Sequence, residues 1–205
     1  MSIKNVIFDF GQVLVHFEPS YMVGKYVEDS EDAKLISEVL FDRLYWDRLD
    51  AGTIEDSEVV RESQKRLPQR LWNVTEKIYY NWIYNLPEMD GMREVVEKLK
   101  EKGIHLFLLS NISTYFASHA KEIPILSYFE RCVFSAVCGY VKPTRDIFSY
   151  LCEACGIEPS ETVFVDDNAA NVAGAEAFGI KGYLFDGNAK RLQAELDRLI
   201  GGEEC

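Results

Sequence analysis

The chain has 205 residues, of which 47% are hydrophobic and 27% are charged, a balance typical of a globular protein with a sizeable core. Its formal net charge of −12 argues against a nucleic-acid partner, because no cluster of Lys and Arg outweighs the surrounding acidic residues. No apolar run approaches the roughly 20 residues of a membrane span, and the first apolar run is too short for a signal peptide. We therefore expect no membrane partner and a cytoplasmic location, which the odd number of cysteines also fits.

The first predicted element is a buried strand that ends in a carboxylate. Three apolar residues, Val6-Ile7-Phe8, precede Asp9, and Gly11 lets the chain turn sharply beyond it. Open α/β sheets bind their ligands at the carboxyl ends of central strands. Asp9 is therefore a candidate nucleophile or metal ligand.

Residues 17–87 show helical periodicity and no strand pattern. Within them, the segment 43–52 combines aromatic rings, arginines and carboxylates near a turn. Rings and carboxylates suit sugar faces and hydroxyls, and Arg43 or Arg48 could hold a distal phosphate, so we take both as candidate substrate-binding residues. The alternative is helix packing under a salt-bridged surface, and Trp46 fits a core position better than a ligand contact.

Helices and strands alternate through the rest of the chain. This alternation predicts an α/β fold with a doubly wound parallel sheet, a Rossmann-like core formed by residues 1–16 and 88–205, interrupted by an all-helical insertion over 17–87. The predicted strands lie at 104–109, 132–134, 162–165 and 182–185, and the predicted helices at 90–102, 146–155 and 188–200.

Polar groups follow these strands at the positions where a ligand would bind. Ser110 and Asn111 follow the second strand, Lys142 lies in a loop before a helix, and Asp166-Asp167 follow the strand at 162–165. A carboxylate nucleophile, a hydroxyl, an ammonium and a late acidic pair are what phosphoryl transfer through an aspartyl-phosphate requires, with Mg²⁺ neutralising the developing charge.

Four motifs are thus present, carrying Asp9, Ser110, Lys142 and the pair Asp166-Asp167 in turn. In these motifs the chain resembles the haloacid dehalogenase superfamily, on its phosphatase side. The resemblance implies that Asp9 forms the phosphoenzyme and that Ser110 and Lys142 hold the transferring phosphoryl group. It also implies that Asp166 and Asp167 serve a Mg²⁺ site, with Asp167 the direct ligand. Residues 17–87 then correspond to a helical cap that closes over the site and reads the substrate. Asn111, beside Ser110, is a further candidate for substrate binding.

The first motif departs from the family at one position. Most phosphatases of this superfamily carry a second Asp two residues after the nucleophile, and here Gly11 stands there. Its backbone carbonyl can still serve the metal, but proton transfer to the leaving group, worth ~10²–10⁴-fold, is lost. A good leaving group, a water or another residue would have to compensate, and His16 is one candidate.

The Asp-x-Gly-x-Val motif also resembles a bacterial subgroup with sugar-phosphate phosphatase activity. We therefore expect hydrolysis of a small phosphorylated metabolite, most plausibly a sugar phosphate. Dehalogenation is disfavoured by the acidic pair, which is costly without a cation. Two alternatives stay open. Phosphonate hydrolysis needs a cap lysine, for which Lys25 and Lys34 are undistinguished candidates. A binding protein without turnover would explain Gly11. The sequence does not predict the oligomeric state.

Overall fold

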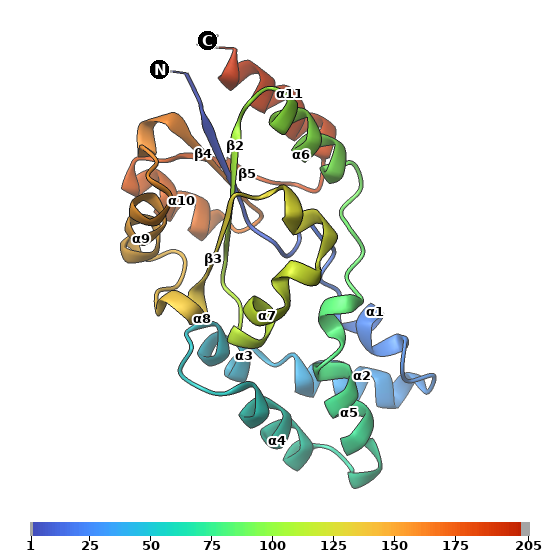
Figure 1. Cartoon of the computed structure of the whole chain (residues 1–205). Helices are drawn as coiled ribbons and strands as arrows, with labels where there is room; N and C mark the ends of the chain where they lie inside the picture. The colour runs from blue at the N-terminus through green and yellow to red at the C-terminus, as the bar shows by residue number, and fades with distance from the viewer. Residues whose placement is uncertain (1, 202–205) are drawn as a thin grey trace.

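The computed structural model describes residues 2–201 and contains one sheet of five parallel strands in the order β3-β2-β1-β4-β5 (Figure 1). Helices cover both faces of this sheet, so the prediction of a doubly wound α/β fold is confirmed. No helix within residues 2–201 is long and apolar enough to cross a membrane. The strands are β1 (Asn5–Phe8), β2 (His105–Ser110), β3 (Arg131–Phe134), β4 (Thr162–Asp166) and β5 (Lys181–Leu184).

Side chains of successive strand residues enter opposite layers of the core, as the two-residue repeat of a strand requires. Val6 and Phe8 belong to the core cluster that includes residues of α6 (Met92–Glu101) and α11 (Ala189–Ile200). Ile7, between them, packs in the second cluster with α9 (Arg145–Cys155) and α10 (Ala169–Phe178). Because both faces are covered, β1 is apolar at every position but its first, which is why the sequence marks it so clearly.

The strand register brings the predicted site residues to one edge of the sheet. Phe8 pairs with Leu108 on one side and with Val165 on the other, so the residues that follow emerge at the same carboxyl edge. The chain builds the sheet outward from β1 through β2 to β3, and then crosses back to place β4 on the other side of β1. Asp9 and Asp166 thus lie at the point where the strand order reverses, which is where such sheets bind ligands.

The chain between β1 and β2 is helical up to α6, with no strand among these described residues, in agreement with the sequence prediction. These helices lie beyond the carboxyl ends of the strands (Figure 1). Asp29 and Asp42 cap two of them by accepting hydrogen bonds from backbone N–H groups of the first turn. The helical elements between β1 and α6 are α1 (Pro19–Gly24), α2 (Ser30–Leu40), α3 (Arg43–Asp50), α4 (Asp56–Arg66), η1 (Gln69–Leu71), α5 (Trp72–Tyr79) and η2 (Trp82–Tyr84).

The two chain segments that join this helical region to the sheet run beside each other. Val15 and Glu88 form an antiparallel bridge, and the backbone N–H of His16 donates to the carbonyl of Pro87 at 2.8 Å. The division into 1–16 and 88–205 on one side and 17–87 on the other stays a prediction. For brevity we call residues 17–87 the helical segment.

Aromatic side chains fill the space between the helical segment and the sheet. Phe17, Trp46 and Trp82 form mutual edge contacts with ring centroids 5.5–5.6 Å apart. Trp82 also stacks on Phe116 of α7 at 5.7 Å. Trp46 is buried, and its indole N–H donates to the carbonyl of Leu40 at 2.7 Å, as a core position requires. The remaining elements are α7 (Thr114–His119), η3 (Ala120–Glu122), η4 (Pro124–Tyr128), α8 (Ser135–Cys138) and η5 (Pro159–Glu161).

Candidate active site

A cavity of about 370 Å³ lies between the carboxyl edge of the sheet and the helical segment. Its lining brings together residues that are up to 162 positions apart in the sequence, from Asp9 to Asn171. From the core it is lined by residues including Asp9, Gly11, Ser110, Asn111, Lys142, Asp167 and Asn171, and from the helical segment by Phe17, Arg43, Trp46, Asp50 and Trp82.

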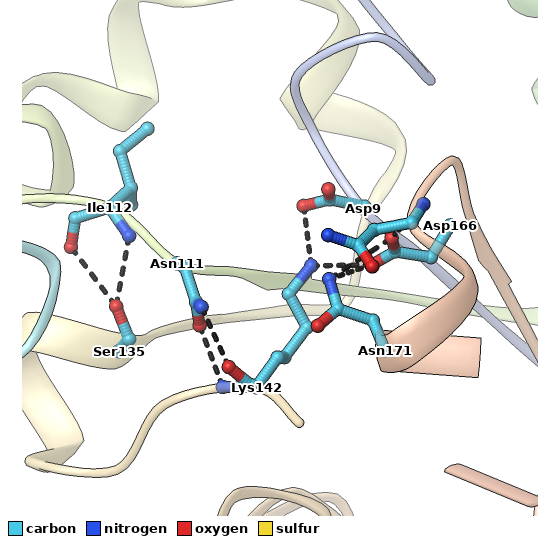
Figure 2. Close-up of polar contacts among 8 residues, drawn as sticks. Asp9, Asn111, Ile112, Ser135, Lys142, Asp166 and Asn171 are labelled. Atoms are coloured by element: carbon cyan, nitrogen blue, oxygen red, sulfur yellow. Dashed lines mark hydrogen bonds and ion pairs between the residues drawn. The ribbon is translucent and has the colours of Figure 1, made fainter. Parts of the chain in front are cut away.

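Lys142 forms the centre of the charge arrangement. Its Nζ lies 2.8 Å from Oδ1 of Asp9 and 2.7 Å from Oδ2 of Asp166, and its side chain is almost completely buried (Figure 2). A buried ammonium is stable only with such partners, and it fixes both carboxylates in turn. Through these two contacts, Lys142 connects Asp9, which follows β1, with Asp166 at the end of β4.

Asp166 is the most enclosed carboxylate of the site. Its Oδ1 accepts from the backbone N–H of Asn168 at 2.8 Å, and both oxygens accept from Nδ2 of Asn171 at 3.1 Å (Figure 2). Together with Lys142 these donors satisfy the carboxylate within the protein. Asp167, by contrast, is exposed to the cavity. This contrast makes Asp167 the better placed of the pair to bind an exogenous cation, and Asp166 the residue that holds Lys142.

The site has the donors that a hard divalent cation needs. One carboxylate oxygen from each of Asp9, Asp166 and Asp167 lies within 4.8 Å of the others. Carboxylate oxygens suit Mg²⁺, which also keeps several waters and so needs no complete protein cage. Gly11 lines the same cavity and has only its backbone to offer.

The buried charges perturb one another. Burial, opposed by Lys142 and assisted by Asp166, raises the pKa of Asp9 to about 6. Burial and the neighbouring Asp166 also raise the pKa of Asp167. For Lys142, burial acts to lower the pKa, but the carboxylates of Asp9 and Asp166 outweigh it and raise the pKa. A divalent cation among these acids would favour their ionised forms.

Ser110 and Asn111 occupy the end of β2 beside these charges. Ser110 is buried and lines the cavity, so its hydroxyl can reach a ligand there. The amide of Asn111 is already engaged: its Oδ1 accepts from the backbone N–H of Lys142 at 2.8 Å, and its Nδ2 donates to the carbonyl of Lys142 at 3.1 Å. Asn111 lines the cavity while its amide holds the backbone of Lys142, and the predicted role in substrate binding stays a prediction.

The two arginines predicted to bind substrate have different surroundings. Arg43 lines the cavity and forms an ion pair with Asp47 at 2.6 Å. Arg48 is not among the lining residues, and its guanidinium faces Glu58 at 3.9 Å. The helical repeat explains this difference, because positions 43, 46 and 50 share one helix face and position 48 does not. Arg43 thus lies at the cavity and Arg48 outside its lining, and a substrate-binding role for either stays a prediction.

His16, the sequence-based candidate for proton transfer, is not among the residues that line the cavity. Among the lining residues to which the sequence analysis gave no role are Asn171, which donates to Asp166, and Asp50, at the end of α3. The spacing of Asp50 from Arg43 and Trp46, seven and four residues, was a signal that could have indicated it.

The arrangement can support attack by the Asp9 carboxylate on an electrophilic centre, with the Lys142 ammonium and a bound cation stabilising negative charge on the group under attack.

Comparison with known proteins identifies relatives that are phosphatases. The chain is 26% identical over 180 residues to a D-ribitol-5-phosphate phosphatase of Bacteroides thetaiotaomicron, an alignment that covers 83% of this chain and 85% of the relative.

Two solved structures have the same fold. A haloacid dehalogenase-like family hydrolase from Porphyromonas gingivalis superposes with a TM-score of 0.73 at 25% identity over 100% of both chains. A haloacid dehalogenase family enzyme from Bacteroides thetaiotaomicron, solved as a magnesium complex, superposes with a TM-score of 0.70 at 24% identity, covering 92% of this chain and 96% of that one. The family model for a haloacid dehalogenase-like hydrolase matches residues 3–179, and the chain therefore belongs to the haloacid dehalogenase-like hydrolases.

Proposed function

We propose that the protein is a Mg²⁺-dependent phosphatase that hydrolyses a small phosphorylated metabolite through an aspartyl-phosphate on Asp9. The observation that carries the proposal is the position of Asp9: it lines the cavity, lies 2.8 Å from the Lys142 ammonium and belongs to a carboxylate group suited to a divalent cation. A nucleophile, a fixed cation and a metal site within one cavity are the components of phosphoryl transfer.

The residues of the site divide the tasks of the proposed reaction, and Asp9 serves both as nucleophile and as metal ligand. The Asp9 carboxylate attacks phosphorus, while the Ser110 hydroxyl and the Lys142 ammonium hold the phosphoryl oxygens. Asp9 and Asp167, with the carbonyl of Gly11, would hold Mg²⁺, and Asp166 would keep Lys142 charged and in place beside them. The metal, when bound, supplies positive charge that neutralises the phosphate. Water then releases phosphate and regenerates Asp9.

A sugar or alditol phosphate is the substrate class that we propose. Its support is the phosphatase relative that acts on D-ribitol 5-phosphate and the lining of the cavity opposite Asp9. Arg43 offers a guanidinium, whose fixed N–H donors suit the hydroxyl or phosphate oxygens of such a substrate. The free cysteines among the described residues fit a reducing compartment, so we propose the cytoplasm.

The alternative chemistries find less support. Phosphonate hydrolysis was considered with Lys25 or Lys34 as the amine, but neither lines the cavity, and Lys34 pairs with Glu38 at 3.8 Å. The lysine in the lining is Lys142, which is held by two carboxylates. Dehalogenation needs no metal site, and the group of Asp9, Asp166 and Asp167 is costly without a cation.

The test is phosphate release from a panel of sugar, alditol and aryl phosphates, measured with Mg²⁺ and with a chelator. We expect selective release that requires Mg²⁺ and that the Asp9→Asn variant lacks, with Ser110→Ala slowed to a smaller degree. Full activity of Asp9→Asn would refute the aspartyl-phosphate, and full activity in chelator would refute the metal requirement. If wild-type protein binds the esters without releasing phosphate, the binding-only alternative is correct.

A further inference from the structure

Asp50 is a buried carboxylate that no part of the mechanism above uses. It is the last residue of α3, only 7% of its surface is exposed, and it lines the same cavity as Asp9. Its Oδ1 is buried and has no hydrogen-bond partner within the described chain. An unpartnered buried carboxyl oxygen costs free energy, so a residue of this kind at a cavity wall points to a ligand that completes it.

The backbone at Asp50 is fixed against the core. Ser135, the first residue of α8, donates its hydroxyl to the carbonyl of Asp50 at 2.6 Å and accepts from the backbone N–H of Ile112 at 2.9 Å. Figure 2 shows this hydroxyl beside Ile112, next to the Asn111 and Lys142 pair. A Cβ on Gly52 would lie 2.7 Å from the carbonyl oxygen of Ala136, so only glycine permits this approach. The turn after α3 thus lies in close contact with Ser135 and Ala136 at the start of α8.

The other titratable groups of the cavity lining already have tasks. They are Asp9, Arg43, Lys142 and Asp167. In the proposed reaction Asp9 is the nucleophile, Lys142 is held between two carboxylates, and Asp167 serves the metal. Arg43 forms an ion pair with Asp47 at 2.6 Å, and a guanidinium does not act as an acid or base in proteins. Asp50 is therefore the one lining group that can exchange a proton without leaving another task.

In-line attack decides which side of the cavity receives the leaving group. The leaving oxygen lies across phosphorus from the attacking Asp9 carboxylate, and therefore toward the wall opposite Asp9. Asp9 belongs to the carboxyl edge of the sheet, and the lining residues that come from the helical segment include Asp50 and Trp46 on one face of α3. In Figure 1, α3 lies beyond the carboxyl ends of β1 and β2.

We propose that Asp50 is the general acid and base of this enzyme, taking the role that a carboxylate at position 11 would otherwise fill. This inference rests on the proposed phosphatase activity. In the first step, the Asp9 oxygen bonds to phosphorus and the bond from phosphorus to the leaving oxygen breaks. That oxygen keeps the electron pair and takes the proton of Asp50, leaving as an alcohol. In the second step, water bonds to phosphorus and gives one proton to the Asp50 carboxylate, while the bond from phosphorus to Asp9 breaks and phosphate leaves.

The charges around Asp50 suit this cycle. Burial, the largest effect, raises the pKa of Asp50 to about 7, Asp47 and Asp9 act in the same direction, and Arg43 and Lys142 act against them. A carboxyl group poised near neutral pH can carry a proton in one step and accept one in the next.

The experiment compares phenyl phosphate with p-nitrophenyl phosphate in wild-type protein and in Asp50→Asn. The two esters have nearly the same shape and no free hydroxyl, but nitrophenolate leaves without a proton, whereas phenolate is far more basic. The measured quantity is kcat/KM, because it reports attack by Asp9 and departure of the leaving group but not hydrolysis of the phosphoenzyme, which is the same for both esters. We expect kcat/KM for phenyl phosphate to fall about 100-fold or more in Asp50→Asn, and that for p-nitrophenyl phosphate to fall less than about threefold. Glu38→Gln, which removes an exposed carboxylate from α2, is the control and should leave both rates unchanged.

Each outcome decides the inference. Equal losses on both esters, or no loss on either, would overturn the role of Asp50 as acid, while turnover by wild type would leave the proposed phosphatase intact. Turnover of p-nitrophenyl phosphate also reports that Asp50→Asn is folded. If that variant does not fold, the wild-type pH profile provides the test. Here kcat/KM for phenyl phosphate should fall as pH rises above about 7 while kcat/KM for p-nitrophenyl phosphate does not, and parallel profiles would overturn the assignment.

Discussion

Replacing Lys142 with methionine removes the cation on which two carboxylates depend. The Lys142 side chain is 1% exposed and that of Asp166 is fully buried, so water cannot replace the contact between them at 2.7 Å. Asp9, which is 13% exposed, loses its contact at 2.8 Å as well. Methionine keeps much of the volume of the side chain, which leaves the charge as the main change. Turnover should be lost, because the phosphoryl oxygens lose their fixed cation.

The expected loss of stability follows from this burial. Removing one partner of a buried ion pair typically costs about 3–5 kcal/mol, because the remaining charge stays buried without compensation. Here the protein can limit the cost by protonating Asp9, whose pKa is already raised to about 6. We therefore expect the metal-free variant to lose about 3 kcal/mol of unfolding free energy at pH 8 and less at pH 5.

Urea unfolding in chelator, followed by tryptophan fluorescence and by far-ultraviolet circular dichroism, measures this difference. Lys102→Met is the matched control, since Lys102 pairs with Asp197 at 2.6 Å but both side chains are more than 40% exposed. An exposed pair contributes about 0–1 kcal/mol. If Lys142→Met were no more destabilised than Lys102→Met at pH 8, or if it kept full turnover, the reasoning about the central ammonium would be wrong.

Three further predictions concern the turn after α3. The pKa of Asp50 is about 7 in the folded protein and about 4 in the unfolded chain, so the folded state binds the proton more tightly. The free energy of unfolding therefore falls as pH rises from about 4 to about 7. Asp50→Asn should remove this contribution, on the order of 3 kcal/mol between pH 5 and pH 8, which urea unfolding of metal-free protein at the two pH values measures. Ser135→Ala leaves the carbonyl of Asp50 and the N–H of Ile112 unpaired, and calorimetry should show a loss of about 1–3 kcal/mol. Gly52→Ala combines a φ of 67° with a clash on Ala136, so we expect a loss of about 1–3 kcal/mol together with slower phosphate release; unchanged stability would contradict the close docking.

The sequence by itself determined the sheet and the residues at its carboxyl edge. A strand buried on both faces is a continuous apolar run, and each such run ends where its polar residue begins, so Asp9, Ser110 and Asp166 could be read from local pattern alone. The alternation of these strands with helices then predicted their parallel arrangement, which brings their ends together.

Side-chain tasks within the helical segment could not be read in the same way. The pattern of α3 identified an unusual mixture of rings and charges but did not separate Arg43, which lines the cavity, from Arg48, which does not. The orientation of the helix toward the sheet decides this, and it depends on how Trp46 and Trp82 pack against Phe17.

Only the tertiary structure decided the surroundings of Asp50. Its burial and its unpartnered oxygen arise because the turn after α3 docks on Ser135, a residue 85 positions away in the sequence. The same is true of Asn111, whose amide brackets the backbone of Lys142, 31 positions away. Local propensities carry no information about such pairs, because the free energy of a buried polar group depends on the atoms that packing places around it.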